Sequence, residues 1–334
     1  MKYRVLGAML LLFLVACQSR STKETTLQPG TLDSLKNRLP EKEILALPLG
    51  TVRRVSIIDG IICLYYNREQ SSYALALWDM DLRLLRTFVE YGPGADQMML
   101  IGPTSGGGRY VLPDPILKKV MMVDIKKAAA DTSYHPVIYQ SDIYTQEEIP
   151  FGERILFLNP YAYKGRAPRV LVSDKKWNYR WRRQPDYSGF NINIGRLIYS
   201  PEKERIAYCP LCEPVIELMD GRGNLIQTIT FPRQRNIIGE IPVGTHVELV
   251  YQDPIRYCFL SADGSDDLIA CVFEDDGGDH LVVVFDWEGN IIDGFRTGFK
   301  IKQISLASDS RSVYCWESDG ERERLDQYLL SERQ

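Results

Sequence analysis

The stretch that decides the fold is Val284-Phe285-Asp286, followed after two intervening residues by Gly289-Asn290-Ile291-Ile292. An apolar run ends at an aspartate, whose side chain can cap the backbone of a turn. Gly-Asn then supplies the positive φ angles of a tight turn, and a second apolar run leaves it. The stretch therefore predicts a β-hairpin whose first strand ends at Asp286.

The same sequence pattern occurs twice more, and the three copies align without a gap. Leu218-Met219-Asp220 is followed by Gly223-Asn224-Leu225-Ile226, and Leu77-Trp78-Asp79 is followed by Leu84-Leu85. We therefore expect Asp79, Asp220 and Asp286 to occupy equivalent positions at the ends of equivalent strands.

Asp124 and Asp174 also follow short apolar runs and are degenerate copies, so the five aspartates lie 45, 50, 46 and 66 residues apart. A period of about 40–50 residues with several short strands per unit is typical of a β-propeller blade. We expect the longest interval to hold an insertion within residues 233–250, and residues 301–330 to supply a last blade. The sequence predicts an all-β fold, a six-bladed β-propeller, with a β-sandwich as the structural alternative.

The length and composition are sufficient to bury a large core, as one large β domain or as two smaller domains. The 334 residues are 45% hydrophobic and 25% charged, with a net charge of -4. This excludes a disordered chain and a disulfide-dense miniprotein. The acidic balance argues against nucleic acid as a partner, because phosphate binding needs a basic surface.

The N-terminus looks like an export signal. Lys2 and Arg4 precede an apolar stretch over residues 5–16, which is shorter than the roughly 20 residues that span a bilayer. It ends Leu14-Val15-Ala16-Cys17, which resembles a bacterial lipobox. That resemblance implies cleavage before Cys17 and its modification with lipid, whereas the alternative is an ordinary signal peptide or an uncleaved anchor.

These observations predict three parts: a lipoprotein signal peptide over residues 1–16, a lipidated flexible tether over 17–40, and the propeller over 41–334. The tether assignment rests on the polar residues that follow Cys17. In some Gram-negative bacteria, an acidic run just after the lipid-bearing cysteine directs a lipoprotein to the cell surface. No acidic residue precedes Glu24 in this segment. We therefore expect a cell-envelope location, as an outer-membrane lipoprotein facing the periplasm.

Several segments resemble the TolB-like six-bladed β-propeller lipoproteins of Gram-negative bacteria. They are the Gly-Pro-rich turn at residues 91–98, residues 205–208, residues 214–225, residues 253–257 and residues 283–290. The resemblance implies the propeller fold. It implies no particular activity, because the function of this family is not established and a fold does not fix one.

Cys209-Pro210-Leu211-Cys212 is a C-x-x-C pair. A redox motif needs a helix after the first cysteine, but the flanking residues are strand-like, and no second pair completes a zinc site. Cys209 and Cys212 are therefore expected to be two buried or semi-buried thiols at a hairpin, or a local disulfide formed in the oxidising periplasm. The other cysteines after Cys17 lie in apolar runs and are expected to pack as small hydrophobic residues.

Asp253-Pro254-Ile255-Arg256-Tyr257 follows the expected insertion. In the TolB-like family this segment resembles the first strand of a blade, and such strands line the central channel. Asp253 and Arg256 are therefore candidate channel contacts, which would either brace neighbouring blades or meet a ligand.

Other chemistry-bearing residues favour structural roles. His135, His246 and His280 are isolated in the sequence, and the acidic run at residues 274–279 lacks calcium-loop spacing, which favours a solvated hairpin turn. The basic and aromatic run at residues 175–183 is interpreted as a strand with one packed face, with a stacking surface for sugars or bases as the alternative. No metal and no cofactor is predicted.

The sequence favours a membrane-anchored, non-catalytic binding or scaffold module whose ligand it does not identify. The expected contacts are the membrane, through the lipid, and another envelope protein or a glycan, but not nucleic acid. The alternative is a metal-assisted hydrolase or lyase with its site in the central channel. Asp, Glu, Asn or His side chains converging at one channel mouth would favour that enzyme.

Overall fold

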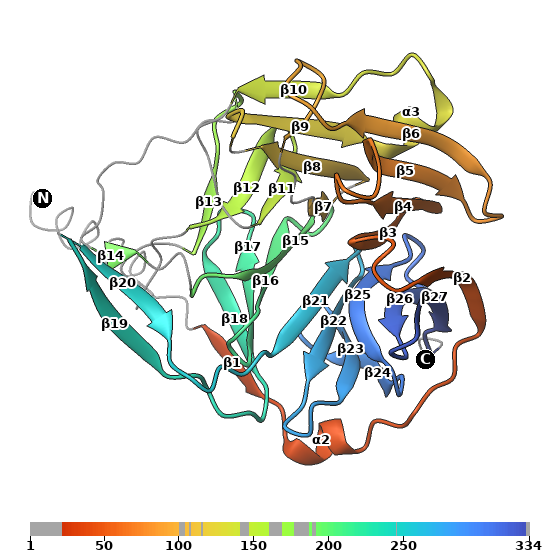
Figure 1. The fold of residues 1–334 in the computed structure, drawn as a ribbon. Helices are drawn as coiled ribbons and strands as arrows, with labels where there is room; N and C mark the ends of the chain where they lie inside the picture. Colours follow the sequence, from red (N-terminus) through yellow and green to blue (C-terminus); the bar gives the residue numbers. More distant parts are fainter. Residues whose placement is uncertain are drawn as a thin grey trace, which may run out of the picture.

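Six β-sheets are arranged like blades around a central channel (Figure 1). This computed structural model describes residues 22–331 except 100–103, 107, 115, 141–146, 160–168, 177–186, 189–191 and 245. The predicted all-β, six-bladed propeller is confirmed. The signal peptide, Cys17 and the aromatic part of the basic run at 175–183 lie outside the described residues.

The blades follow one another along the chain, and the first strand of each blade lies next to the channel. Blade 1 contains β3 (Arg54–Ile58), β4 (Ile61–Tyr65), β5 (Tyr73–Asp79) and β6 (Leu84–Glu90). Blade 2 contains β7 (Thr104–Gly106), β8 (Arg109–Asp114), β9 (Lys119–Asp124), α3 (Ile125–Ala130) and β10 (Val137–Gln140). The described strands of blade 3 are β11 (Glu148–Phe151), β12 (Arg154–Leu158) and β13 (Val170–Val172).

Blades 4 and 5 have the same antiparallel order. Blade 4 contains β15 (Gly195–Ser200), β16 (Arg205–Pro210), β17 (Val215–Asp220) and β18 (Leu225–Thr230). Blade 5 contains β21 (Phe259–Gly264), β22 (Leu268–Glu274), β23 (His280–Asp286) and β24 (Ile291–Arg296).

Blade 6 joins the two ends of the chain. It contains β25 (Lys300–Leu306), β26 (Ser312–Ser318), β27 (Arg322–Leu329) and, as its outermost strand, β2 (Lys42–Pro48). β2 pairs antiparallel with β27, from Lys42 opposite Gln327 to Pro48 opposite Arg322. The N-terminal strand therefore closes the ring, and the predicted last blade at 301–330 is completed by residues from the other end of the sequence.

Residues 22–41, here called the strap, cross the outer edges of blades 4, 5 and 6. β1 (Lys23–Thr26) adds to blade 4 as a fifth strand, parallel to β18. Leu27 and Leu32, the latter in α2 (Pro29–Asp33), are buried in the core between blades 4 and 5. Arg38 forms an ion pair with Asp293 at 2.8 Å.

The strap overlaps with the flexible tether that the sequence predicts over residues 17–40. Its described part, residues 22–40, is packed against the propeller, although the sequence assigned it to a flexible segment. The sequence did not reveal this packing, because a fifth strand is held by backbone hydrogen bonds. Polar residues such as Thr25 and Thr26 form these bonds as well as apolar residues do. The boundaries at residues 16 and 40 stay predictions.

The core is divided among the interfaces between blades. Each of the six buried apolar clusters in the described residues joins two neighbouring sheets, and together these clusters complete the circle. Cys63, Cys258, Cys271 and Cys315 are buried members of the clusters, as predicted. Each blade is therefore stabilised mainly by its neighbours.

The repeated aspartates occupy equivalent positions. Asp79, Asp220 and Asp286 each end the third strand of a blade. The Oδ1 atom of Asp286 accepts hydrogen bonds from the backbone N–H groups of Glu288 (3.0 Å) and Asn290 (2.8 Å). Asp220 and Asp79 accept the same i+2 and i+4 pair, so the repeat derived from the sequence is confirmed.

The degenerate copies keep part of this geometry. Asp124 ends the third strand of blade 2, but it caps α3 by accepting from Lys127 N at 3.0 Å. Asp174 follows β13 and accepts from Lys176 N at 2.8 Å, which is the i+2 half of the motif. Both lie where the period placed them.

We expect Asp286→Ala to destabilise the protein by about 1–2 kcal/mol, because two backbone N–H groups lose a charged acceptor. Asp267→Ala is the control, because the side chain of Asp267 is not an acceptor for this turn. Denaturant unfolding measures both variants. Equal stability of the two would show that the aspartate does not hold the turn.

The predicted insertion is a separate hairpin. β19 (Ile238–Val243) and β20 (His246–Tyr251) pair antiparallel, and β14 (Tyr187–Ser188) pairs parallel with β20. The side chain of Arg233 is buried before this hairpin and donates to the carbonyl oxygens of Tyr257 and Glu274. The hairpin is therefore fastened to blade 5 on both sides.

One buried polar cluster lies between blades 5 and 6. The Nε atom of Arg324 is 2.7 Å from Asp326 Oδ2, and its Nη2 atom is 3.4 Å from Glu317 Oε1. Both carboxylate side chains are 0% exposed. Tyr328 donates to Glu317 at 2.7 Å, and the Arg324 guanidinium lies 3.7 Å from the centre of the Phe299 ring.

Candidate functional site

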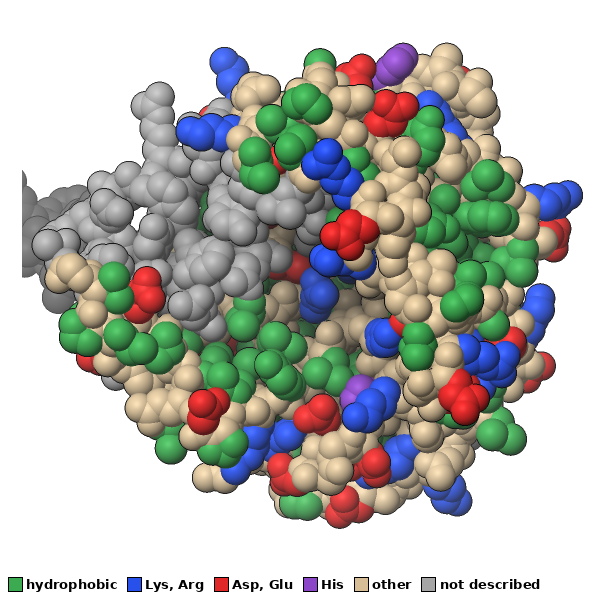
Figure 2. Space-filling model, viewed as in Figure 1, with side chains coloured by type: hydrophobic (Ala, Val, Ile, Leu, Met, Phe, Trp, Pro, Cys, Tyr) green, Lys and Arg blue, Asp and Glu red, His purple; other side chains and the backbone are tan. Residues whose placement is uncertain are grey.

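The central channel brings together charged side chains from four blades. Arg54 begins β3, Glu147 precedes β11, Arg196 lies in β15 and Asp263 lies in β21. Arg54, Glu147 and Asp263 line a narrow cavity of about 20 Å³, here called the constriction. Figure 2 shows basic and acidic side chains bordering a hollow at the centre of the molecule.

Arg196 and Glu147 form an ion pair across two blades. Arg196 Nη1 lies 2.9 Å from Glu147 Oε2, and the Glu147 side chain is only 4% exposed. The other carboxylate oxygen of Glu147 accepts from Leu197 N at 3.4 Å. The Arg196 side chain is 31% exposed, so it contacts both Glu147 of the constriction and the solvent.

Arg54 is a buried cation near a second arginine. Burial lowers its pKa, and the neighbouring charge of Arg196 lowers it further, whereas Tyr110, Glu147 and Asp263 act in the opposite direction. The two guanidinium groups therefore repel each other, and an anion bound near both would stabilise their charged forms.

Asp263 lies deeper in the channel. Burial raises its pKa to about 6, although backbone hydrogen bonds from Leu306 and Gly264 act against the rise. Its Oδ2 atom accepts from Leu306 N at 2.9 Å. Asp263 therefore joins blade 5 to blade 6 and lies near the charge of Arg54.

Short polar side chains join the inner strands in the same way. Ser261 accepts from Ile304 N at 3.1 Å, and Ser305 accepts from Ile57 N at 3.1 Å. Gln303 donates to Ser56 at 2.8 Å. These buried bonds fix the relative height of blades 5, 6 and 1, and so they hold the constriction in place.

The channel has two different ends. We call the end where the inner strands begin the upper end and the opposite opening the lower mouth. The lower mouth is a cavity of about 380 Å³ lined by Asp59, Gly108, Pro201, Asp266 and Ser308, together with Asp263. Asp59 and Asp266 make this opening acidic, although Lys126 lies 3.3 Å from Asp59.

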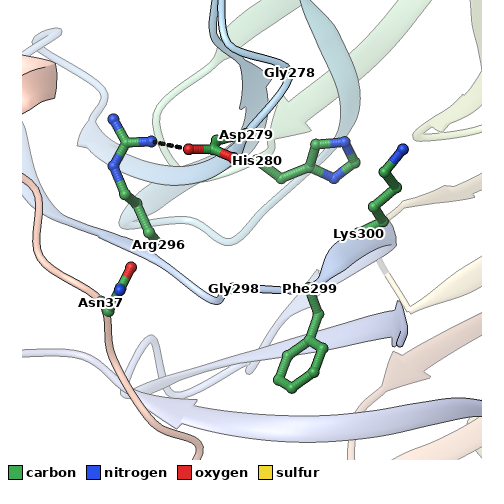
Figure 3. A pocket seen from close by; sticks show the side chains of 8 residues that line it. All are labelled: Asn37, Gly278, Asp279, His280, Arg296, Gly298, Phe299 and Lys300. Carbon is green, nitrogen blue, oxygen red and sulfur yellow. Dashed lines mark hydrogen bonds and ion pairs between the residues drawn. The ribbon is translucent and has the colours of Figure 1, made fainter. Parts of the chain in front are cut away.

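A second pocket lies at the upper end, between blades 5 and 6 (Figure 3). This cavity of about 360 Å³ is lined by Asn37 of the strap and by His280, Arg296, Phe299 and Lys300, among others. Arg296 points toward Asp279 and binds both Asp275 (2.8 Å) and Asp279 (3.3 Å). Its charge is therefore already compensated by two carboxylates.

The structure places Cys209 and Cys212 as buried free thiols, which is the first of the two alternatives. Burial raises the pKa of Cys209 to about 12 and that of Cys212 to about 11. Such thiols are protonated at neutral pH and are not nucleophiles.

Asp253 and Arg256 do not lie in an inner strand. They belong to the connection between β20 and β21, where Asp253 is exposed and Arg256 half-buried, and the strand begins only at Phe259. The prediction that this segment opens a blade strand was wrong. Asn236 accounts for the difference, because its side-chain amide bonds both the N–H (2.8 Å) and the carbonyl (2.7 Å) of Arg256.

The remaining candidates lie apart. The run at 274–279 forms the turn between β22 and β23, as predicted, with Asp275 accepting from Gly277 N and Asp279 N. His280 Nδ1 accepts from Ile301 N at 2.8 Å, and the side chain of His246 lies outside the described residues. In the described part of the chain, no three His, Cys, Asp or Glu side chains are grouped to hold a metal ion, and no helix is long and apolar enough to cross a bilayer.

The channel charges were missed by sequence analysis. Arg54, Glu147, Arg196 and Asp263 are scattered along more than 200 residues, and no spacing connects them. Their common feature is their place in or beside the first strand of a blade, which becomes visible only after every strand has been assigned.

Comparison with solved structures supports the fold. A predicted exported protein from Bacteroides fragilis is 10% identical with a TM-score of 0.51, covering 93% of this chain and 99% of its own. A member of the DUF4221 family from Bacteroides vulgatus is 9% identical with a TM-score of 0.51, covering 88% and 96%. At this identity the likeness shows the fold alone. No family model matches the chain, and no curated protein matches its sequence.

Proposed function

We propose that this protein is a lipid-anchored, non-catalytic binding module of the bacterial cell envelope, and that it holds the anionic end of a ligand at the channel constriction. The observation that carries the proposal is the convergence of the Arg54 and Arg196 guanidinium groups from two blades on the channel, beside Glu147 and Asp263. An oxyanion there would accept hydrogen bonds from guanidinium groups in fixed positions.

The size and charge of the channel define the ligand. The constriction has room for about one water-sized group, so an oxygen of a carboxylate or a phosphate enters while the rest of the ligand stays outside. The acidic lower mouth repels an anion, so the ligand approaches from the upper end, where the Arg196 side chain reaches solvent. Another envelope protein or a glycan that carries such a group fits this description.

The location is part of the proposal. The lipobox-like sequence supports an anchor at Cys17, and one structural neighbour is described as exported. We propose an outer-membrane lipoprotein facing the periplasm, related to the TolB-like lipoproteins. Asp59, Asp263 and Asp266 meet at the lower mouth, a convergence that would favour the hydrolase or lyase alternative. Among the residues that the structure describes, however, no three His, Cys, Asp or Glu side chains are grouped to hold a metal ion, so we propose binding.

Inorganic phosphate tests the anion site. We expect it to raise the melting temperature of the wild-type protein by about 2–4 °C at saturation, because a ligand that binds only the native state stabilises it. Arg54→Gln and Arg196→Gln should each abolish the shift, whereas Lys300→Gln, which removes a cation from the second pocket, should retain it. Sodium chloride at equal ionic strength is the control. An undiminished shift in both arginine variants would exclude the constriction as the site.

Cys17→Ser tests the anchor. Without the thiol that receives the lipid, we expect the variant to accumulate as an unprocessed precursor and to be absent from detergent-extracted lipoproteins. Membrane fractionation and mass spectrometry of the N-terminus measure both effects. Normal cleavage together with normal membrane association of the variant would contradict the anchor.

A further inference from the structure

The described chain begins at one end of the propeller. Lys23 lies opposite Gln227, near the start of β18, and its Nζ atom donates to Glu288 O at 3.5 Å. Glu288 belongs to the turn after Asp286, and Trp287 of this turn donates to the carbonyl of Ser265 at 3.1 Å. Ser265 lines the lower mouth. Lys23 is therefore at the edge of the lower face, on which the lower mouth and the Asp220 and Asp286 turns lie.

Few residues separate this point from the proposed anchor. Six peptide units join Cys17 to Lys23, and a fully extended chain of that length spans about 20 Å. The six residues of β18 rise from the lower to the upper face over a similar distance, about 20 Å. To reach a membrane lying against the upper face, this segment would have to be fully extended along the whole height of the blade.

We infer that the lower face of the propeller is turned toward the phospholipid surface, and that the upper end of the channel faces away from it. This inference rests on the proposed lipid anchor at Cys17. The strap makes the arrangement specific, because residues 22–41 are held by β18, by the core between blades 4 and 5 and by Asp293. Residues 22–41 therefore cannot act as a long flexible linker between the lipid and the propeller.

The orientation matches the direction of ligand entry. In the proposed function an anion reaches the constriction from the upper end, where the Arg196 side chain is 31% exposed. A propeller fixed by its lower edge presents that end to the aqueous space, so a large partner can approach without displacing lipid. The acidic lower mouth then faces the membrane and does not take part in capture.

Two exposed glutamates allow a matched measurement. Glu202 lies in the turn after β15, where the inner strand of blade 4 ends, and so it is on the lower face. Glu321 lies in the turn between β26 and β27 and is on the upper face, because β26 runs back from the lower end. Neither side chain has a hydrogen bond or ion pair with the described residues, so Glu202→Cys and Glu321→Cys should both fold.

The experiment uses the full-length lipidated protein in vesicles of phosphatidylethanolamine and phosphatidylglycerol. Each introduced cysteine carries a fluorescent donor, and a lipid with an acceptor on its headgroup reports the distance. The cysteines of the described chain are buried, so they should stay unlabelled. We expect energy transfer from position 202 to be several-fold greater than from position 321.

The outcomes separate the two proposals. Equal transfer from both positions, or greater transfer from position 321, in protein that carries the lipid and floats with the vesicles would overturn the orientation alone. Wild-type protein that carries no lipid at Cys17 would overturn the anchor and the orientation together.

Discussion

A chain that begins at residue 49 is expected to lose the cooperative unfolding transition of the native protein. Without β2, the outer edge of β27 loses its antiparallel partner, and Ile44 leaves the apolar cluster between blades 6 and 1. The same truncation removes Leu27 and Leu32 from the core between blades 4 and 5. Because each blade is stabilised by its neighbours, opening one interface weakens the whole ring. Circular dichroism during thermal unfolding measures the effect.

A permuted chain provides the control. Glu41 N donates to Gln327 O at 2.8 Å, so the start of β2 and the end of β27 are neighbours. Joining residue 331 to residue 41 through a short Gly-Ser linker, in a chain that begins at residue 49, returns β2 to its place without the rest of the strap. We expect this chain to regain a cooperative transition at a lower temperature than the native protein. A truncated chain as stable as the native one would show that β2 is dispensable.

Arg324→Met is expected to destabilise the protein by about 3–5 kcal/mol, because it leaves Glu317 and Asp326 buried without a cation. Arg322→Met is the control on the same strand. The Arg322 side chain is 49% exposed and pairs with Glu43 at the surface, so its loss should cost about 0–1 kcal/mol. Denaturant unfolding compares the two variants, and equal losses would contradict the buried role of Arg324.

The loss caused by Arg324→Met should grow with pH. Burial raises the pKa of Glu317, and its hydrogen bond with Asp326 raises it further, so the native pair holds a proton that the unfolded chain releases above about pH 4.3. A native state that binds more protons than the unfolded state loses stability as pH rises. Removing the guanidinium strengthens this effect, because Arg324 lowers the pKa of both acids. In a protein that already carries Asp326→Asn, the stability lost through Arg324→Met should be smaller and should depend less on pH.

The sequence predicted the parts of the fold that local chemistry determines. An aspartate that accepts two backbone N–H groups needs only the residues of its own turn, so Asp220 and Asp286 revealed the blade period directly. The insertion was visible because it lengthened one interval. β1 was not visible, since a strand that pairs with an outer edge needs no apolar pattern, and none of its four residues is buried.

The site was harder to predict because it depends on the register of several blades. The pairing of Arg196 with Glu147 requires blades 3 and 4 to meet at one height, and no local motif encodes that height. Asp253 and Arg256 showed the opposite error. Their segment resembles the first strand of a blade in the TolB-like family, which suggested a channel strand. In the structure, Asn236 holds that segment as a loop.

The pairing of β2 with β27 also sets the order in which the molecule can be completed. Lys42 is synthesised near the beginning of the chain, but its partner Gln327 follows some 280 residues later. Until then, β2 is an unpaired edge strand, able to associate with the wrong neighbour. Ring closure brings together the most distant segments of the sequence, and contacts of this kind form slowly. A nascent chain is therefore exposed to aggregation and proteolysis during its synthesis until β27 has been made and pairs with β2.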